Sequence, residues 1–371
     1  MRDTMGLIIT NDEKIPPITD IRAVGALPIA GSYRMIDFIL SNMANAGIVN
    51  IGVITESNYS SLMDHMKSGS PWDLDRKNYG LSILPPNLAS FDYYQGRGDL
   101  DRLAGVRYFL RKSKQTYVIL SMDNLIYNID FEDVMEKHIE NQSDITVIYK
   151  DMSGSPEYEL SRYTLIELDK DNRVTDMEVK PQYPKSAKAS LEVYVMEKAL
   201  LESIIDECVS RGEHYFVRDG LAKKLSGIHI NGYEFTGYSE KIDSLKSYFE
   251  NNMTFLDKNY RQELLNTKNP IYTKNKDLSP AVYKENAKVE NSLISNGCYI
   301  EGTVINSVLS RGVVVKKGAV IKNAIIMQDS VIEENVSLDN VILDKEVVIT
   351  KDKKLVGQNS YPVAIAKGSV V

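Results

Sequence analysis

Acidic residues directly follow two short apolar runs, a position at which a carboxylate can hold a metal ion or contact a substrate. Asp12 and Glu13 come after the run GLIIT, and Asp123 comes after the run TYVILSM. No glycine lies between the first of these runs and Gly25, so backbone amides there cannot approach a phosphate closely. Asp12 and Glu13 would in addition repel a triphosphate. These strand ends therefore offer carboxylates that could bind a metal ion, but no loop that could bind a phosphate.

The elements that must position these residues alternate along the first two-thirds of the chain. Four short apolar runs predict buried strands, and between them lie segments of helical periodicity such as 36–46 and 99–112. Such alternation predicts an α/β domain with a mixed, mostly parallel sheet and helices on both faces. Ligands bind such sheets at the carboxyl ends of the strands. The four strand runs are 6–10, 49–55, 116–122 and 144–150.

The last part of the chain changes to a repeat. Three blocks of 17 residues (307–323, 324–340 and 341–357) align without gaps, and a shortened copy (292–306) precedes them. Aliphatic residues share columns across the copies, which predicts a parallel β-helix with a continuous core. An antiparallel meander would not keep these columns. One column is Ile300, Val315, Ile332 and Ile349, and another holds the pairs 293/294, 308/309, 325/326 and 342/343.

Composition restricts the class of protein. The 371 residues carry 44 Lys plus Arg against 51 Asp plus Glu, a net charge of −7, which argues against a nucleic-acid binder. No apolar run approaches the ~20 residues of a membrane helix, and the start lacks the regions of a signal peptide. Cys208 and Cys298 lie far apart, and the four histidines show no ligand spacing. We expect a cytoplasmic protein with one domain at 1–256, a linker at 257–285 and a second domain at 286–371.

The most specific stretch is GSYRMIDFILSNMANAGIVNIGVIT (31–55). It closely resembles the glucose-1-phosphate adenylyltransferases (ADP-glucose pyrophosphorylases), whose matching stretch reads roughly GGKYRIIDFALSN. Taken alone, Asp37 in this stretch is somewhat better explained as an ordinary helix-start carboxylate. Further matches occur in the family's order at 64–74, 83–86, 93–99, 118–127, 179–181 and 214–221.

The resemblance covers nearly the whole chain and implies a fold and a reaction. Members of this family have a Rossmann-like nucleotidyltransferase domain followed by a left-handed parallel β-helix. They join ATP and glucose 1-phosphate to give ADP-glucose and pyrophosphate for glycogen synthesis. The fold class that we expect is therefore this pair of domains.

The same resemblance indicates that parts of the mechanism are missing. The family's loop GGxGTRL is replaced by NDEKIPPIT, and its phosphate-facing lysine is Val24. The second metal carboxylate aligns with Tyr215. The carboxylate that would bind sugar hydroxyls is Val179, and a small glycine of the sugar pocket is Glu192. A single carboxylate without a second one and without the phosphate loop is a poor Mg²⁺ site.

Several residues remain at positions that match the family's functional ones. Asp123 is kept as a single remnant metal ligand, and Lys180 and Arg22 stand at vestigial catalytic positions. Lys180 and Ser190 would form a remnant of the sugar-phosphate site. The remnant of the nucleotide-binding site would consist of Tyr94, Gln95, Gly96 and Asp99.

This pattern of retention and loss resembles the D-type regulatory subunits of the family. The resemblance implies a non-catalytic chain that needs no cofactor and joins a catalytic, Mg²⁺-dependent subunit in a heterotetramer. ATP and sugar phosphates are further candidate ligands, whereas nucleic acid and membrane are not expected as partners. Two alternatives stay open: an active adenylyltransferase with an unusual phosphate loop, and a sensor that binds a sugar nucleotide without reacting.

Overall fold

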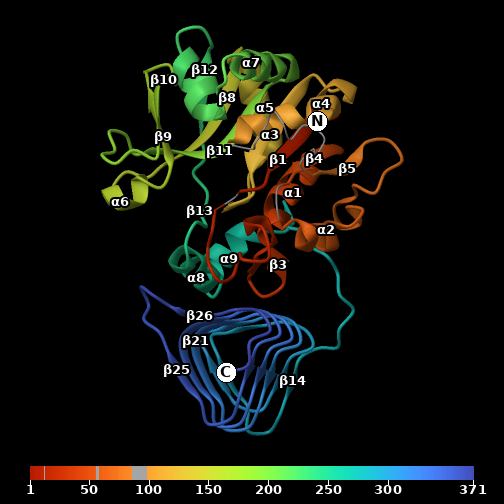
Figure 1. Ribbon diagram of the computed structural model, residues 1–371, viewed down its shortest axis with the longest axis vertical. Coiled ribbons are helices and arrows are strands. Elements are labelled where there is room, and N and C mark those ends of the chain that lie inside the picture. The colour runs from red at the N-terminus through yellow and green to blue at the C-terminus, as the bar shows by residue number, and fades with distance from the viewer. Residues whose placement is uncertain (12, 56–57, 86–97) are drawn as a thin grey trace.

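The computed structural model describes residues 1–11, 13–55, 58–85 and 98–371. Figure 1 shows an α/β domain that carries the N-terminus and, below it, a stack of flat coils that carries the C-terminus. The two-part architecture expected from the sequence is confirmed. The first domain positions the candidate site, and the second packs against its lower surface.

A nine-stranded mixed sheet forms the centre of the first domain. Its longest path runs β10-β9-β11-β6-β1-β4-β5, with β8 and β12 beside β11. All strands except β10 and β11 share one direction, as the mostly parallel prediction requires. The strands are β1 (Thr4–Ile9), β4 (Asn50–Ile54), β5 (Gly80–Leu84), β6 (Tyr117–Met122), β8 (Ile145–Asp151), β9 (Thr164–Leu168), β10 (Val174–Val179), β11 (Lys188–Glu197) and β12 (Ile230–Glu234).

Helices cover both faces of this sheet because its strands are apolar on both sides. In β1, Ile8 belongs to the cluster beneath α1, α2 and α5, whereas Leu7 and Ile9 belong to the cluster beneath α3, α4 and α7. Successive side chains of a strand point to opposite faces, which explains this division. The helices are α1 (Met35–Asn45), α2 (Ser60–Met66), α3 (Asp99–Gly105), α4 (Arg107–Lys112), α5 (Phe131–Glu140), α6 (Glu157–Leu160) and α7 (Lys198–Ser210).

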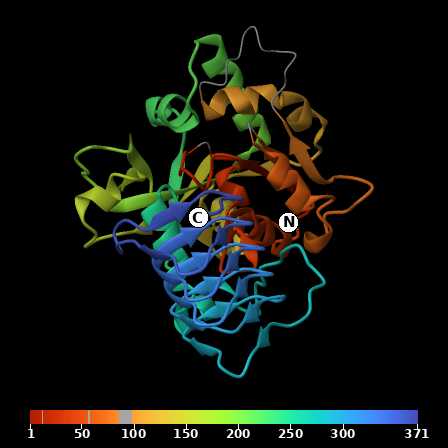
Figure 2. The ribbon, with the colours of Figure 1, turned by 60° about the horizontal axis from the view of Figure 1, so that its bottom comes forward.

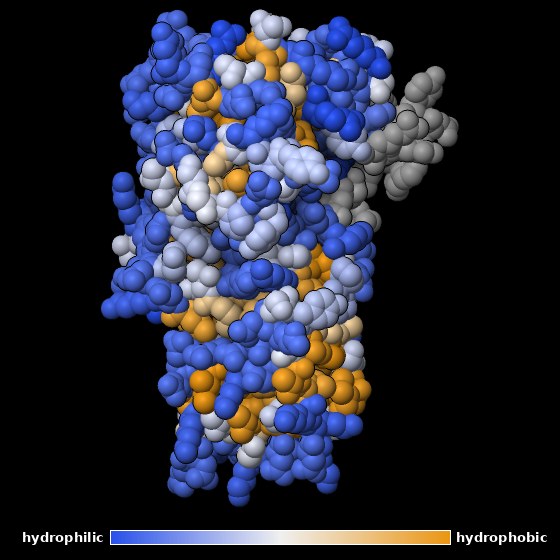
Figure 3. All heavy atoms as spheres, turned by 90° about the vertical axis from the view of Figure 1, so that its left-hand side faces the viewer, coloured by the Kyte–Doolittle hydropathy of each residue, from blue (hydrophilic) through white to orange (hydrophobic). Residues whose placement is uncertain are grey.

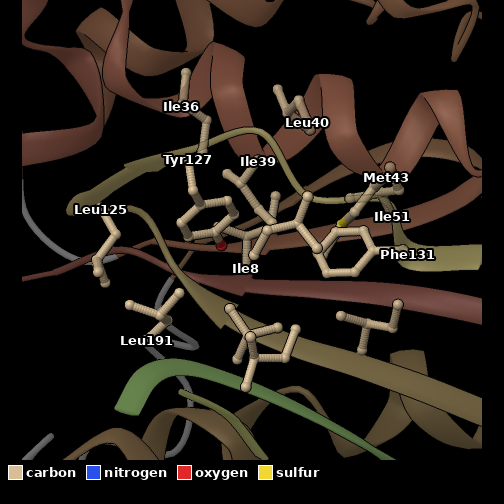
Figure 4. Close-up of a cluster of buried hydrophobic side chains, with 14 of the residues drawn as sticks. Ile8, Ile36, Ile39, Leu40, Met43, Ile51, Leu125, Tyr127, Phe131 and Leu191 are labelled. Carbon is tan, nitrogen blue, oxygen red and sulfur yellow. The ribbon is translucent and has the colours of Figure 1, made fainter. Parts of the chain in front are cut away.

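The helix α1 occupies the middle of the stretch 31–55. Asp37 Oδ2 accepts a hydrogen bond from the backbone N–H of Arg34 at 2.9 Å, and Asp37 Oδ1 lies 2.5 Å from Nε2 of His65. Burial lowers the pKa of His65, although the charge of Asp37 partly opposes this shift. Asp37 is thus the helix-start carboxylate, and the apolar side of α1 packs on the sheet through Ile36, Ile39, Leu40 and Met43 (Figure 4).

The segment between the domains is only partly irregular. The range 257–285, expected to be a linker, begins with α9 (Lys258–Leu264) and ends with β14 (Val282–Tyr283). Asp257 caps α9 by accepting a hydrogen bond from the N–H of Asn259 at 2.7 Å. The helix is short and polar, so it lacks the apolar periodicity that reveals longer helices. Smaller elements are β2 (Pro28–Ile29), β3 (Tyr33–Arg34), β7 (Leu125–Tyr127), β13 (Ser239–Lys241), α8 (Leu245–Thr254), η1 (Val24–Ala26), η2 (Ser70–Trp72), η4 (Phe216–Leu221) and η5 (Ala222–Lys224).

The second domain is a left-handed parallel β-helix whose coils stack in register (Figure 2). One predicted column is confirmed, because each of its residues pairs with the next on the following coil and all four are fully buried: Ile300, Val315, Ile332 and Ile349. The column at 293, 308, 325 and 342 is confirmed as well. The strands are β15 (Lys288–Glu290), β16 (Leu293–Ile294), β17 (Tyr299–Ile300), β18 (Thr303–Ile305), β19 (Val308–Leu309), β20 (Val314–Val315), β21 (Val320–Ile326), β22 (Val331–Ile332), β23 (Ser337–Leu343), β24 (Val348–Ile349), β25 (Lys354–Val356) and β26 (Val363–Ile365).

Helix length also bears on membrane insertion. Among the described residues, no helix is both long enough and apolar enough to cross a lipid bilayer.

The buried column of the β-helix leads to a stability prediction. Ile332→Ala should lower the free energy of unfolding by about 3 kcal/mol, because it leaves a cavity among fully buried aliphatic side chains. Glu334→Ala, at an exposed turn two residues away, should change it by less than about 0.5 kcal/mol. Urea denaturation followed by circular dichroism measures both. Equal effects of the two substitutions would contradict the assigned column.

Candidate active site

A cavity of about 290 Å³ lies at the carboxyl ends of β1 and β6, where a doubly wound sheet binds its ligands. Most of its walls are apolar or aromatic, and the polar groups are few. The polar side chains come from the start of α3, the end of β6, the start of β9, the middle of β11 and η4. The lining residues are Ile9, Asp99, Leu120, Ser121, Met122, Thr164, Val179, Glu192, Tyr194, Tyr215, Phe216, Val217 and Arg218.

Asp123, the single remnant metal ligand of the sequence prediction, is absent from this lining. Its side chain is fully buried, and Oδ1 accepts a hydrogen bond from the backbone N–H of Asn11 at 2.7 Å. Gly25 of the short helix η1 lies directly against the carboxylate, so closely that a Cβ there would overlap Oδ2. Asp123 therefore joins the ends of β1 and β6 to η1.

Lys180, predicted to hold a phosphate, instead faces an acid of its own chain. It follows β10, and its Nζ lies 3.3 Å from Oε1 of Glu13, in the segment after β1. About half of the lysine side chain is exposed, so this ion pair contributes little to stability. It nevertheless places a carboxylate beside the cation that would otherwise attract a phosphate.

Glu192, expected in place of a small glycine of the family's sugar pocket, lines the cavity. Its backbone has φ +55°, the left-handed region that favours glycine, which costs a side-chain-bearing residue about 1 kcal/mol. Its carboxylate pairs with Lys241 Nζ at 3.0 Å, and this lysine is 1% exposed. The neighbouring Glu178 pairs with Lys185 at 2.7 Å, whereas Val179 lines the cavity. The one-residue displacement of this carboxylate thus leaves an aliphatic side chain in the pocket.

The remaining predicted residues mostly support the local fold. Asp99 Oδ1 accepts hydrogen bonds from the N–H groups of Leu100 at 3.0 Å and Phe216 at 2.8 Å, and burial raises the pKa of Asp99. Ser190 is fully buried and accepts a hydrogen bond from the N–H of Glu192. Tyr94, Gln95 and Gly96 lie outside the described residues.

Tyr215, expected at the position of the second metal carboxylate, lines the cavity beneath Arg218, whose guanidinium lies 4.1 Å from the ring centroid. A phenol under a cation is not a ligand for Mg²⁺, which prefers carboxylate oxygens. Among the described residues, no group of three or more His, Cys, Asp or Glu side chains is arranged to hold a metal ion. The residues at this site therefore do not fit the Mg²⁺ ion that the family uses.

Arg22 is not at this cavity but at the interface of the two domains. Its Nη1 lies 2.8 Å from Oδ1 of Asp344 in the β-helix, and the side chains are only 2% and 0% exposed. The same nitrogen donates to the carbonyl of Ile18 at 3.2 Å. Arg22, which the sequence placed at a vestigial catalytic position, therefore supplies a buried ion pair between the domains.

A second cavity, of about 470 Å³, lies beside this ion pair. Five of its lining side chains are basic, so it favours an anionic occupant. Burial and the charges of Arg34 and Arg22 lower the pKa of Lys345 to about 7. The basic residues are Arg22, Arg34, Lys276, Lys345 and Lys367, and the acidic ones are Asp64, Asp329 and Glu346.

Sequence reasoning missed the internal partners of the site. Lys241 meets Glu192 across 49 residues, and Asp344 meets Arg22 across 322. No local pattern marks either residue, because each pair forms only when the fold brings distant segments together. The acidic segment after β1 gave a partial indication. It predicted that Glu13 would repel a phosphate, but it did not predict the ion pair of Glu13 with Lys180.

Comparisons with known proteins agree with this fold. Residues 12–258 match the family model described as nucleotidyl transferase, and residues 279–362 match the GlmU-like, C-terminal hexapeptide model. The combination defines a nucleotidyltransferase with a hexapeptide-repeat β-helix.

Individual relatives narrow this class. The glucose-1-phosphate adenylyltransferase of Clostridium novyi is 33% identical over 281 residues, which cover 74% of this chain and 70% of the relative. The Bacillus licheniformis protein of the same name is 32% identical over 75% of this chain and 73% of its own. The glycogen biosynthesis protein GlgD of Bacillus subtilis is 33% identical over 76% and 71%. The chain belongs to the glucose-1-phosphate adenylyltransferase family.

The contact between Gly25 and Asp123 yields a test by double-mutant cycle. Gly25→Ala should destabilise the protein by about 2 kcal/mol, because its Cβ overlaps the buried carboxylate. In an Asp123→Ala background, where that carboxylate is absent, the same change should cost much less. Urea unfolding of the four proteins gives the coupling energy. Additive effects of the two substitutions would show that the methyl group at position 25 does not contact the Asp123 carboxylate.

Because the pKa of Lys345 is lowered in the folded protein, replacing this lysine should stabilise the fold by an amount that depends on pH. A lysine whose pKa falls on folding destabilises the protein fully below the folded value of about 7, and this penalty fades as the pH rises toward the unfolded value. Lys345→Met should therefore raise the melting temperature more at pH 6 than at pH 9. Lys322→Met, at an exposed lysine of the same domain, serves as the control. An increase in melting temperature that is the same at both pH values would contradict the lowered pKa of Lys345.

Proposed function

We propose that this chain is a regulatory, non-catalytic subunit of a glucose-1-phosphate adenylyltransferase that acts in glycogen synthesis. The catalysed reaction joins ATP and glucose 1-phosphate to give ADP-glucose and pyrophosphate. The observation that carries the proposal is the internal use of the remnant site: Asp123 accepts a backbone N–H of Asn11, and Lys180 faces Glu13.

The chemistry of nucleotidyl transfer supports this proposal. The reaction needs a backbone loop around the triphosphate, cations for the charge that builds up, and a metal held by carboxylates. The segment after β1 offers Glu13 where a phosphate would lie near Lys180. Asp123 is enclosed by Gly25, and Tyr215 cannot replace a carboxylate. The loss of one preorganised group typically lowers a rate about 10²–10³-fold, and here several are missing together.

In this proposal the catalytic partner supplies the Mg²⁺ site, and the present chain contributes contacts rather than turnover. The two chains would form a heterotetramer. An effector would be anionic, such as a sugar phosphate or a nucleotide, because the interdomain cavity is lined by Arg22, Arg34 and three lysines. No cofactor is needed by the chain itself.

A sensor that binds without reacting is the second candidate. The specific observation in its favour is the retained cavity of about 290 Å³ at the strand ends. Binding of ADP-glucose to the isolated chain, together with no effect on the catalytic partner, would favour it over the regulatory role.

The decisive measurement is a pair of assays at saturating ATP, glucose 1-phosphate and Mg²⁺. We expect the isolated chain to turn over at least ~10³-fold more slowly than the catalytic partner, because its sequence lacks the glycine-rich phosphate loop and its described residues form no group that could hold a metal ion. Mixing the two chains should raise the partner's activity or alter its effector response. Normal turnover by the isolated chain would overturn the proposal, and so would the absence of any effect on mixing.

A matched pair of variants shows which chain holds the working site. Lys180→Ala is suited to this chain, because the side chain is half exposed and its loss should leave the fold intact. The mixed complex should keep its activity within about twofold. The same substitution at the aligned lysine of the partner should reduce activity strongly, because there the cation would still face a phosphate. Equal losses would assign catalysis to both chains.

A further inference from the structure

Four asparagines form one corner of the β-helix. The pairing of neighbouring coils aligns them, because the strands on both sides of each turn are in register. All four have φ between +40° and +52°, the left-handed region that asparagine tolerates better than most residues. This asparagine corner consists of Asn291, Asn306, Asn323 and Asn340.

A groove of about 840 Å³ runs along the asparagine corner, between the β-helix and the first domain. Its other wall is the segment 249–258, which leads from α8 to the start of α9. In Figure 1, α8 lies directly above the upper left corner of the coils, near β21 and β26. Figure 3 views the molecule from this side, where hydrophobic and hydrophilic residues are mixed on the lower domain. The volume is sufficient for a small-molecule ligand.

The side-chain amides of the corner do not satisfy one another completely. Asn291 Nδ2 donates to Asn306 Oδ1 at 2.8 Å. Asn323 Nδ2 and Asn340 Nδ2 both donate to Asp339 Oδ1, at 2.9 and 3.1 Å. Among the described residues, Asn306 Nδ2 therefore has no acceptor, and Asn323 Oδ1 has no donor. Neither atom is enclosed by protein, so both are available to a ligand in the groove.

These two atoms select the kind of group that can pair with them. They are a donor and an acceptor on neighbouring coils, which lie about 4.8 Å apart. A hydroxyl group both donates and accepts, so adjacent hydroxyls of one ligand can satisfy Asn306 Nδ2 and Asn323 Oδ1 together. Ionised phosphate and carboxylate groups only accept, and they would leave the Asn323 oxygen unpaired.

The charged side chains of the opposite wall also disfavour an anion. They are two carboxylates and one ammonium group, all on exposed residues: Glu250, Asp257 and Lys258. Glu250 lies 3.7 Å from Lys246, and Asp257 caps α9. This groove thus lacks the excess of basic side chains found in the cavity beside Arg22. Its carboxylates can instead accept hydrogen bonds from hydroxyl groups.

A short hairpin continues the corner beyond its last asparagine. Gln358 and Tyr361 exchange backbone hydrogen bonds at 3.1 and 2.9 Å, and Asn359 between them lines the groove. The Tyr361 side chain is 76% exposed. An exposed aromatic ring of this kind provides a flat apolar surface beside polar groups. Sugar rings, with C–H groups on their faces and hydroxyls at their edges, suit such a combination.

We infer that the groove beside the asparagine corner binds a neutral chain of glucose units. From Asn306 to the hairpin there are three coil spacings, about 14 Å, which is longer than one sugar ring. The choice of glucose as the sugar rests on the proposed role in glycogen synthesis. Binding is measured without turnover, however, so a failure of this inference is distinguishable from a failure of that role.

A peptide is less well suited to the groove. An extended peptide binds by pairing with free backbone groups at the edge of a sheet. At this corner the backbone is already used within the β-helix: the N–H of Asn306 donates to the carbonyl of Glu290 at 3.1 Å. The free groups of the corner are side-chain amides.

The test is calorimetric titration of the full chain with two neutral glucose oligomers, maltoheptaose and cellohexaose. They differ in linkage, so the comparison shows which chain geometry fits, and binding of either one supports the inference. Asn323→Gly removes the free acceptor and keeps the backbone conformation, because glycine adopts positive φ readily. We expect this variant to bind about fivefold more weakly, the effect of losing one hydrogen bond.

Asn335→Gly is the matched control. Asn335 has φ +56° and donates to Asp352 Oδ1 at 3.0 Å, as Asn323 does to Asp339, but it lies at another corner outside the groove. It should bind like the parent. Melting curves establish that each variant is folded. If Asn323→Gly does not fold, Tyr361→Ala replaces it with the same expectation, since the ring is exposed.

Three results would overturn the inference. The first is that neither oligomer binds at millimolar concentration, and the second is that Asn323→Gly binds as tightly as the parent. The third is an equal loss in Asn335→Gly. If no oligomer binds and Asn323→Gly instead loses association with the catalytic partner, the groove is a protein contact and the inference is wrong.

Discussion

The hydrogen bond from the backbone of Asn11 to Asp123 fixes the carboxyl edge of the sheet. It joins the chain leaving β1 to the chain leaving β6, the two strands between which a substrate would be held. Because Gly25 covers the same carboxylate, η1 is held there too. Glu13, two residues further along the sequence than Asn11, pairs with Lys180. The fully buried Asp123 carboxylate therefore has a structural role at this edge of the sheet.

The buried contacts around α1, which support this site, tolerate substitution less well than the strand ends do. The core contacts of α1, the Asp37–His65 pair and the bond from Trp72 Nε1 to Ser41 Oγ at 3.2 Å all lie beneath the sheet edge. Substitutions among them would leave buried polar groups unpaired, which costs about 1–3 kcal/mol each. Changes at the strand ends meet solvent or a small cavity and cost much less. This difference would allow a regulatory subunit of the proposed kind to keep the stretch 31–55 while the residues beside it change.

Periodic features were predictable, and pairs distant in sequence were not. The β-helix columns follow from one aliphatic residue recurring at a fixed interval, so Ile332 and Ile349 could be paired from the sequence. The sheet followed from apolar runs. Arg22, in contrast, was placed at a vestigial catalytic position because of its local motif, and only the fold shows that it pairs with Asp344. The helix α9 was missed because its sequence is polar. Asp123 was located correctly after a strand, but its burial under Gly25 depends on tertiary packing.

In the proposed role, a subunit without turnover can influence its partner only through contacts that differ between two states. The interface between the domains is suited to transmit such a difference. A buried ion pair such as Arg22–Asp344 loses much of its favourable energy if the partners separate, because each charge then remains partly desolvated. An anion bound among Arg22, Arg34 and Lys345 would lower the repulsion between these cations and favour the protonated lysine. In this role, anion binding and the relative position of the β-helix would be coupled through the same few charges, and such a coupling acts in both directions.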